Sequence, residues 1–120
     1  MNDYIKVFNK KRAVYKLISE LRYGIIVEGK VFLFFRTKDF YCAMSLKEII
    51  AMYPQIDLFL CHQSKLVNEN YISKTVAYNS DMITLENGKE LDVSHRIKEE
   101  LKPLKFITWI QYLIYFRLKM

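Results

Sequence analysis

The 120-residue chain is poor in the residue types that mark several common protein classes. It contains only two cysteines, too few for a disulfide framework, so reduced thiols and a cytoplasmic location are expected. Three glycines and two prolines leave no flexible linker, and the N-terminus turns polar too quickly for a secretory signal. These absences favour a single cytoplasmic domain.

Patterns typical of catalysis and metal binding are also missing. His62 and His95 have no partner at a recognised metal-ligand spacing, and Cys61 and His62 are neighbours whose side chains would face opposite sides of a strand. The sequence contains no glycine-rich phosphate loop and no nucleophile elbow. We therefore expect no enzyme, no catalytic residue, no metal, no cofactor and no small-molecule substrate.

Apolar residues and positive charge are abundant. Hydrophobic residues make up 52% of the chain and aromatic residues 15%, which predicts a packed core and favours strands. The formal net charge of +6 suits a polyanionic partner, either nucleic acid or an anionic membrane surface. Many small basic proteins bind neither, so charge alone does not decide the function.

Short apolar runs separated by polar turns predict an antiparallel meander in the first half. The expected strands cover residues 4–8, 13–18, 22–27, 31–35 and 40–44. Helix is the alternative for residues 13–21, where apolar residues also keep helical spacing. Gly29 predicts a tight hairpin turn. A helix is expected over residues 46–53, because Ser45 and Glu48 have capping-box spacing and Pro54 follows.

The second half continues with strands and ends on an apolar tail. Strands are expected at residues 57–60, 72–77, 82–85 and 90–93, with a hairpin turn at Asn87-Gly88 and a helix over 95–104 capped by Ser94. Residues 106–116 are too short an apolar run to span a membrane. Three interpretations stay open for this tail: a terminal element docked on the core, a self-association surface, or a membrane-surface contact.

The centre of the chain holds a polar segment between apolar runs, Cys61-His62-Gln63-Ser64-Lys65. Such groups are costly to bury, so we expect them at a rim where they can touch a partner. The stretch resembles the signature of the LytTR-type DNA-binding domain of bacterial transcription regulators. The matching positions are Phe59, His62, Ser64, Val67, Asn68 and Ile72. Residues 83–96 resemble the C-terminal pattern of this family, in which an Asn-Gly hairpin leads into a closing helix.

The resemblance implies a mainly β fold, an elongated stack of antiparallel β-sheets with two or three short helices. It covers residues 1–105 as the DNA-binding domain and leaves residues 106–120 as an apolar C-terminal extension. The implied function is a sequence-specific DNA-binding transcription regulator whose loops enter successive major grooves of promoter DNA. The implied partner is double-stranded DNA. A homodimer formed directly or on DNA is a further expectation, and membrane contact is disfavoured.

The resemblance also implies three DNA-contacting regions. They are a first loop near Glu28 with Gly29 and Lys30, a central segment with His62, Gln63, Ser64, Lys65 and Asn68, and the start of the closing helix with Ser94, His95 and Arg96. Gln63 suits the adenine edge, Arg96 suits guanine or phosphate, and Lys65 suits phosphate. The alternative for each residue is a strand-edge position satisfied locally.

Two positions depart from the family pattern and affect the expected DNA sequence preference. Leu60 stands where the family has arginine, and Lys65 replaces a usual aromatic residue. The alternative function is a small membrane-surface or protein-interaction module that uses the apolar tail. An RNA-binding β-domain is less favoured, because the aromatic residues lie in apolar runs and not on a recognisable stacking platform.

Overall fold

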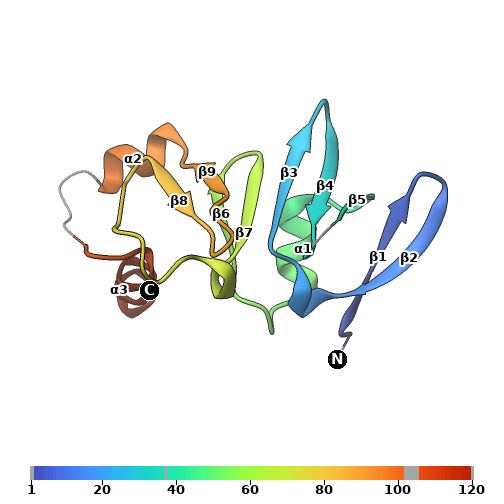
Figure 1. Ribbon diagram of the computed structural model, residues 1–120, viewed down its shortest axis with the longest axis horizontal. Coiled ribbons are helices and arrows are strands. Elements are labelled where there is room, and N and C mark those ends of the chain that lie inside the picture. Colours follow the sequence, from blue (N-terminus) through green and yellow to red (C-terminus); the bar gives the residue numbers. More distant parts are fainter. Residues whose placement is uncertain (1, 37, 102–105, 120) are drawn as a thin grey trace. The chain divides into compact units, whose positions relative to one another are not determined.

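The computed structural model describes residues 2–36, 38–101 and 106–119, and it is mainly β (Figure 1). The strands are β1 (Tyr4–Asn9), β2 (Arg12–Leu17), β3 (Tyr23–Val27), β4 (Lys30–Phe34), β5 (Asp39–Cys42), β6 (Leu58–His62), β7 (Lys65–Asn68), β8 (Met82–Thr84) and β9 (Glu90–Asp92). The helices are α1 (Leu46–Met52), α2 (His95–Leu101), α3 (Trp109–Lys119) and the 3-10 turns η1 (Ile18–Glu20) and η2 (Glu69–Tyr71).

The chain divides into two compact units. Unit 1 comprises residues 1–60 and 64–70, and unit 2 comprises residues 61–63 and 71–120. The larger sheet has seven strands in the order β2-β1-β5-β4-β3-β7-β6, and the smaller one pairs β8 with β9. Within unit 1, β5 lies between the β1–β2 and β3–β4 hairpins (Figure 1).

The core of unit 1 forms where α1 covers one face of the sheet. Alternate strand residues point into it because successive side chains of a strand face opposite sides. The cluster includes Ile5, Val7, Val31, Leu33, Phe40 and Cys42 from the strands, and Leu46 and Ile49 from α1. A Cβ atom at Gly24 would lie 2.8 Å from Leu33 Cδ2 and 3.4 Å from Leu46 Cδ2. Glycine at this position therefore leaves room for the Leu33 side chain in the core.

The capping box predicted for the first helix is present in α1. Ser45 Oγ accepts a hydrogen bond from Glu48 N at 3.1 Å, and Ser45 N donates to Glu48 Oε1 at 3.1 Å. Two of the four backbone donors that a helix start leaves unpaired are satisfied in this way. Leu46 and Ile49 are then held on the buried side of the helix.

The predicted strands of the first half are confirmed, and residues 13–18 form a strand where helix was the alternative. The expected strand over residues 72–77 is wrong, because this segment makes only one isolated bridge, between Ile72 and Leu85. The Ser73 hydroxyl accepts hydrogen bonds from the backbone of Thr75 and Val76 instead. Such local side-chain bonds compete with strand pairing.

Unit 2 contains the β8–β9 hairpin at the predicted Asn-Gly turn. Leu85 and Lys89 are bonded across it, and Gly88 N donates to Leu85 O at 2.9 Å. Of the three turn residues Glu86, Asn87 and Gly88, only Gly88 has a positive φ, of 88°, so the loop is a three-residue turn closed by a left-handed glycine. The helix expected over residues 95–104 is described as far as Leu101, and the rest lies outside the described residues.

The apolar tail forms α3 and packs within unit 2. Trp109 is buried and its Nε1 donates to Met82 O at 2.9 Å, while the Tyr78 backbone N donates to Ile107 O at 2.7 Å. The Tyr78 and Trp109 ring centroids lie 5.0 Å apart, and burial raises the pKa of Tyr78 to about 12. None of the helices in the described part of the chain is long and apolar enough to cross a membrane.

Candidate nucleic-acid interface

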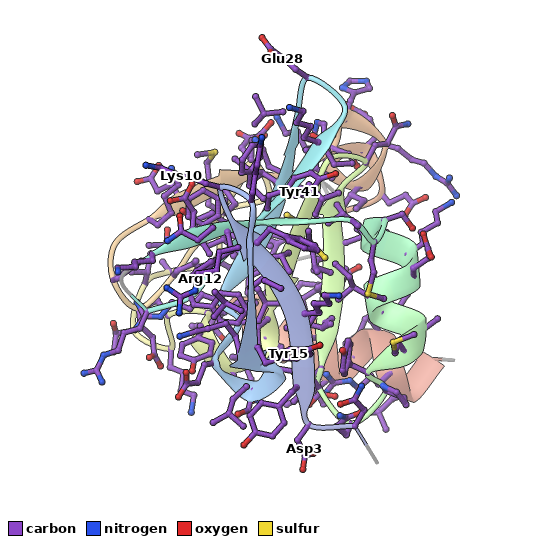
Figure 2. All side chains as sticks on the ribbon, turned by 90° about the vertical axis from the view of Figure 1, so that its right-hand side faces the viewer. Asp3, Lys10, Arg12, Tyr15, Glu28 and Tyr41 are labelled. Carbon is purple, nitrogen blue, oxygen red and sulfur yellow. The ribbon has the colours of Figure 1, made fainter. Side chains whose placement is uncertain are left out.

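The first predicted contact region is the β3–β4 turn of unit 1. Val27 pairs with Lys30, so Glu28 and Gly29 form a two-residue turn with φ values of 51° and 76°. This turn requires positive φ at both positions, which glycine adopts readily and glutamate does not. A Cβ atom at Gly29 would meet nothing within 4 Å. The tip therefore projects from the sheet, with Glu28 at its end (Figure 2).

Lys30, Ser64 and Lys65 gather at one end of β3. Lys30 is opposite Val27 on one side of this strand, and the Ser64 carbonyl accepts from Ile26 N at 2.9 Å on the other side. Lys65 pairs with Ile25. Ile25 also pairs with Phe32, and Phe32 and Lys30 lie two residues apart on β4, so both lysines share one face of the sheet. The structure thus brings two sequence-predicted regions together within unit 1.

Asn68 is the predicted contact that the geometry does not support. Its side chain is 0% exposed, with Nδ2 donating to Leu21 O at 2.8 Å and Oδ1 accepting from Asn70 N at 3.0 Å. A buried amide with both ends bonded inside the chain holds the end of β7 in place and cannot touch a ligand at the surface. We therefore leave Asn68 out of the interface.

In unit 2, the end of β6 lies beside the start of α2. Ser94 N donates to Cys61 O at 2.8 Å, which fixes the first residues of α2 next to His62. His62 is half-buried, and its Nε2 lies 3.9 Å from Asp92 Oδ2. Gln63 is exposed in the turn that follows β6. Two segments about 30 residues apart in sequence, the end of β6 and the start of α2, are thereby brought together.

The start of α2 presents two basic side chains to solvent. Ser94 caps the helix, with Oγ accepting from Ile97 N at 3.4 Å. The side chains of His95 and Arg96 are 87% and 89% exposed. Each lies near a carboxylate one turn on: His95 Nε2 is 3.9 Å from Glu99, and Arg96 Nε is 3.5 Å from Glu100. Exposed pairs of this kind are weak, so a phosphate or base can replace the carboxylate at little cost.

The predicted residues therefore fall into one group in each unit. Unit 1 carries Gly29, Lys30, Ser64 and Lys65, and unit 2 carries His62, Gln63, Ser94, His95 and Arg96. Sequence reasoning missed Asp92, the carboxylate beside His62. Its place 30 residues further along the chain follows from the β8–β9 hairpin, and no spacing in the sequence indicates it.

Metal-ligating side chains do not cluster in the described residues, and the thiols there are buried. No group of three or more histidine, cysteine, aspartate or glutamate side chains in this part of the chain could hold a metal ion. Both cysteines are buried, and burial raises the pKa of the Cys42 thiol, which disfavours the reactive thiolate.

Comparison with known proteins gives one family and one fold. Residues 11–105 match the LytTr DNA-binding domain family. A solved LytTr DNA-binding domain, from a methyl-accepting/DNA response regulator of Bacillus cereus, is similar in structure with a TM-score of 0.72. The two chains are 20% identical, and the match covers 88% of this chain and 100% of that one. No curated protein matches the chain significantly. The resemblance and the mainly β fold class predicted from the sequence are confirmed.

Proposed function

Because this chain belongs to the LytTR family of DNA-binding domains, we propose that it is a sequence-specific transcription regulator that reads promoter DNA through its turns and the start of α2. The family is non-catalytic and its membership makes the chain a DNA-binding regulator. The finer parts of the proposal are the contact residues, the insertion into successive major grooves and a place in the cytoplasm. The contact residues rest on the geometry of the two groups of residues, the groove insertion on the family, and the place in the cytoplasm on the small number of cysteines.

The observation that carries the proposal is the bond between Ser94 N and Cys61 O, 2.8 Å long. It holds the backbone just before Gln63 beside the start of α2, which carries Arg96, and both side chains are exposed. An amide offers a donor and an acceptor together, which matches the major-groove edge of adenine, and a guanidinium matches guanine or phosphate. A patch with both groups can read bases and hold the backbone.

Within unit 1 we assign the positioning contacts. Lys30 and Lys65 share one face of the sheet, and a lysine ammonium binds phosphate as a point charge without selecting a base. Gly29 would let the backbone of the β3–β4 turn approach a DNA strand closely. It has no side chain, and nothing lies within 4 Å of its Cβ position. These contacts would set affinity, while those of unit 2 would set sequence preference.

Fluorescence anisotropy with the protein's own upstream DNA and a scrambled duplex of equal length tests the proposal. The native duplex is expected to bind more tightly than the scrambled one, and the preference should persist at higher salt because base contacts do not depend on counterion release. Equal binding to both duplexes, with an affinity that falls steeply as salt rises, would mean that charge alone acts. It would overturn sequence-specific recognition of the native duplex.

Charge reversal at Arg96 tests the assigned contact. Arg96→Glu is expected to weaken binding to the native duplex by about 1–3 kcal/mol and to reduce the preference over the scrambled one. Lys74→Glu is the matched control, because Lys74 is also exposed in unit 2 and lies outside the proposed patch. Equal losses in the two variants would show a general charge effect and count against Arg96 as a reader.

A second candidate function rests on α3. This helix leaves Ile114 and Leu118 50% and 83% exposed, although its other side is buried. Exposed apolar side chains on one helix suit contact with a protein or a membrane surface, including a second copy on adjacent DNA. Sedimentation with and without DNA, repeated with Leu118→Glu, tests this reading: unchanged association in the variant would exclude this part of α3 as the contact.

A further inference from the structure

The outer face of the sheet in unit 1 carries a row of aromatic side chains. Strand register places Phe8 opposite Tyr41 and Tyr41 opposite Phe32, so the three side chains share one face. The ring centroids of Phe8 and Tyr41 lie 6.1 Å apart, and those of Phe32 and Tyr41 lie 6.4 Å apart. The interplanar angles are 46° and 69°, so the rings form a wall in which no neighbouring pair stacks in parallel.

This face differs from the inner face of the same strands. Phe40 and Cys42 flank Tyr41 in sequence and are buried in the core that α1 covers, whereas Tyr41 is 38% exposed. Phe8 and Phe32 are partly exposed. Aromatic surface that stays in contact with water in the folded chain is available to a ligand. The premise that the aromatic residues of this chain form no exposed platform is therefore wrong for these three.

The aromatic row borders a hollow of about 580 Å³, which we call the aromatic hollow. It is lined by Phe8, Asn9, Lys10, Lys30, Phe32, Asp39, Phe40 and Tyr41. Sites for small ligands usually have volumes of about 300–1,000 Å³. A second hollow of about 530 Å³ adjoins it at the β1–β2 turn and adds Lys11 and Arg12. Figure 2 shows Lys10, Arg12 and Tyr41 on the side of unit 1 that faces the viewer.

The charge around the aromatic hollow is positive. Lys10 and Lys30 line it against a single carboxylate, Asp39, and Lys11 and Arg12 extend the positive charge into the adjoining hollow. Lys6 adds a further ammonium, 5.7 Å from the centre of the Phe8 ring. A second copy that docked with this same face would bring the same positive charges to it and be repelled. An anion with an aromatic part has both features that the surface complements.

Duplex DNA is a poor occupant of the aromatic hollow. Its bases stack on one another inside the helix, so it offers no free base face to Tyr41. A nucleotide offers a planar base for the aromatic wall and a phosphate for the lysines, and base–aromatic stacking combined with positive charge is how proteins hold unpaired bases.

We propose that the aromatic hollow binds a free nucleotide, with the base against Tyr41 and Phe32 and the phosphate toward Lys10 and Lys11. The Asp39 carboxylate accepts a hydrogen bond from an exocyclic amino group, which favours adenine over uracil. The ligand binds without any covalent step. This site goes beyond the proposed DNA contact: the two share Lys30, but Phe8, Tyr41, Asp39 and Lys10 are not part of the DNA interface.

Titration of the isotope-labelled full chain with adenosine monophosphate, followed by nuclear magnetic resonance, tests the proposal. Adenosine and inorganic phosphate serve as separate probes of the two halves of the ligand. Signals of Tyr41, Phe32 and Lys10 are expected to shift together and saturate with the nucleotide. Each half alone should bind at least about tenfold more weakly, because stacking and phosphate contacts each contribute. Uridine monophosphate should bind more weakly than the adenine nucleotide.

Two variants separate stacking from charge. Tyr41→Ala should weaken nucleotide binding about tenfold, while Tyr41→Phe keeps the ring and should stay within about twofold. Lys10 has a φ of 58°, a conformation that asparagine tolerates, so Lys10→Asn removes the charge without disturbing the turn. This variant should lose affinity for the nucleotide and keep its weak affinity for adenosine. Lys30 is left unchanged, because it also belongs to the proposed DNA contacts.

Three outcomes would overturn the site. They are no shift of Tyr41 with any nucleotide at millimolar concentration, equal binding of phosphate and nucleotide, or binding by a single-stranded oligonucleotide without binding of the mononucleotide. Duplex DNA affinity of Tyr41→Ala is the fold control and is expected to match that of the unmodified chain. If Tyr41→Ala keeps its affinity for duplex DNA and loses nucleotide binding, Tyr41 serves the nucleotide site and not the DNA interface.

Discussion

The two helices α1 and α2 have the same length and the same capping residue, but their first turns differ in charge and burial. Each spans seven residues and follows a serine. In α1 the capping box is complete and Leu46 and Ile49 are buried. In α2 the serine bond is longer, at 3.4 Å, and the first turn has no acidic residue. Helix α1 thus packs into the core, whereas the first turn of α2 exposes its side chains to solvent.

The charge at the two helix starts supports this distinction. The N-terminal end of a helix carries a partial positive charge that favours acids. Helix α1 has Glu48 there, whereas the first turn of α2 has no acidic residue and carries the Arg96 guanidinium, which the same partial charge disfavours. A small loss of stability at α2 is understandable if this guanidinium serves an anionic partner. The proposed DNA contact supplies such a partner.

Truncation of one isoleucine in each helix should give the largest difference. Ile49 is 0% exposed in the core, so Ile49→Ala should lower the free energy of unfolding by roughly 2–5 kcal/mol through lost burial and a residual cavity. Ile97 is only partly buried, and Ile97→Ala should cost about 1 kcal/mol or less. Urea denaturation of both variants checks this, and equal losses would contradict the assignment of α1 as the packing helix.

Removal of the two serine caps should give a smaller difference of the same sign. Ser45→Ala removes the Oγ that accepts from Glu48 N at 3.1 Å, while the backbone N that donates to Glu48 remains, and should cost about 1 kcal/mol of stability. Ser94→Ala removes one bond of 3.4 Å and should cost less. Threonine at each position is the control that keeps the hydroxyl. A greater loss at Ser94 than at Ser45 would show that the cap of α2 is the stronger one.

The pH dependence should separate the caps further. Hydrogen bonds from Ser45 hold the pKa of the Glu48 carboxyl below its ordinary range. A lowered pKa in the folded chain means that this contribution is present above the unfolded value of about 4.3 and is lost as the pH falls through the lowered pKa. Glu48→Gln keeps a capping side chain without a titrating group, so its acid loss of stability should be smaller. Acid titration of both proteins by circular dichroism checks this.

The capping box shows how much the sequence could predict. Ser45 and Glu48 interact across three residues, so their spacing alone indicates the contact, and most strands and the Asn87-Gly88 turn are equally local. The strand prediction for residues 72–77 was wrong for a different reason. The hydrogen bonds of the Ser73 hydroxyl are also local, but the pattern of apolar residues does not indicate them.

Contacts between residues distant in sequence could not be predicted from the sequence pattern. The Asn68 amide bonds to Leu21, 47 residues away, so the motif match suggested a DNA contact where the fold uses a buried bond. The aromatic row of Phe8, Tyr41 and Phe32 depends on strand register, because a shift by one residue would turn each side chain to the other face. Register between strands that are distant in sequence is set by packing, which no local pattern encodes.

The smallest expected effect concerns the ion pair of Arg96 with Glu100. Both side chains are largely exposed, and an arginine that precedes glutamate by four residues is the less favourable order on a helix. A double-mutant cycle with Arg96→Ala and Glu100→Ala should therefore give a coupling of about 0.3–0.5 kcal/mol or less. In DNA binding the two single variants should act in opposite directions, because removal of Glu100 frees the guanidinium and removes a negative charge. A coupling above about 1 kcal/mol, or weaker DNA binding after Glu100→Ala, would show that the pair itself shapes α2 and that Arg96 is held there for structure.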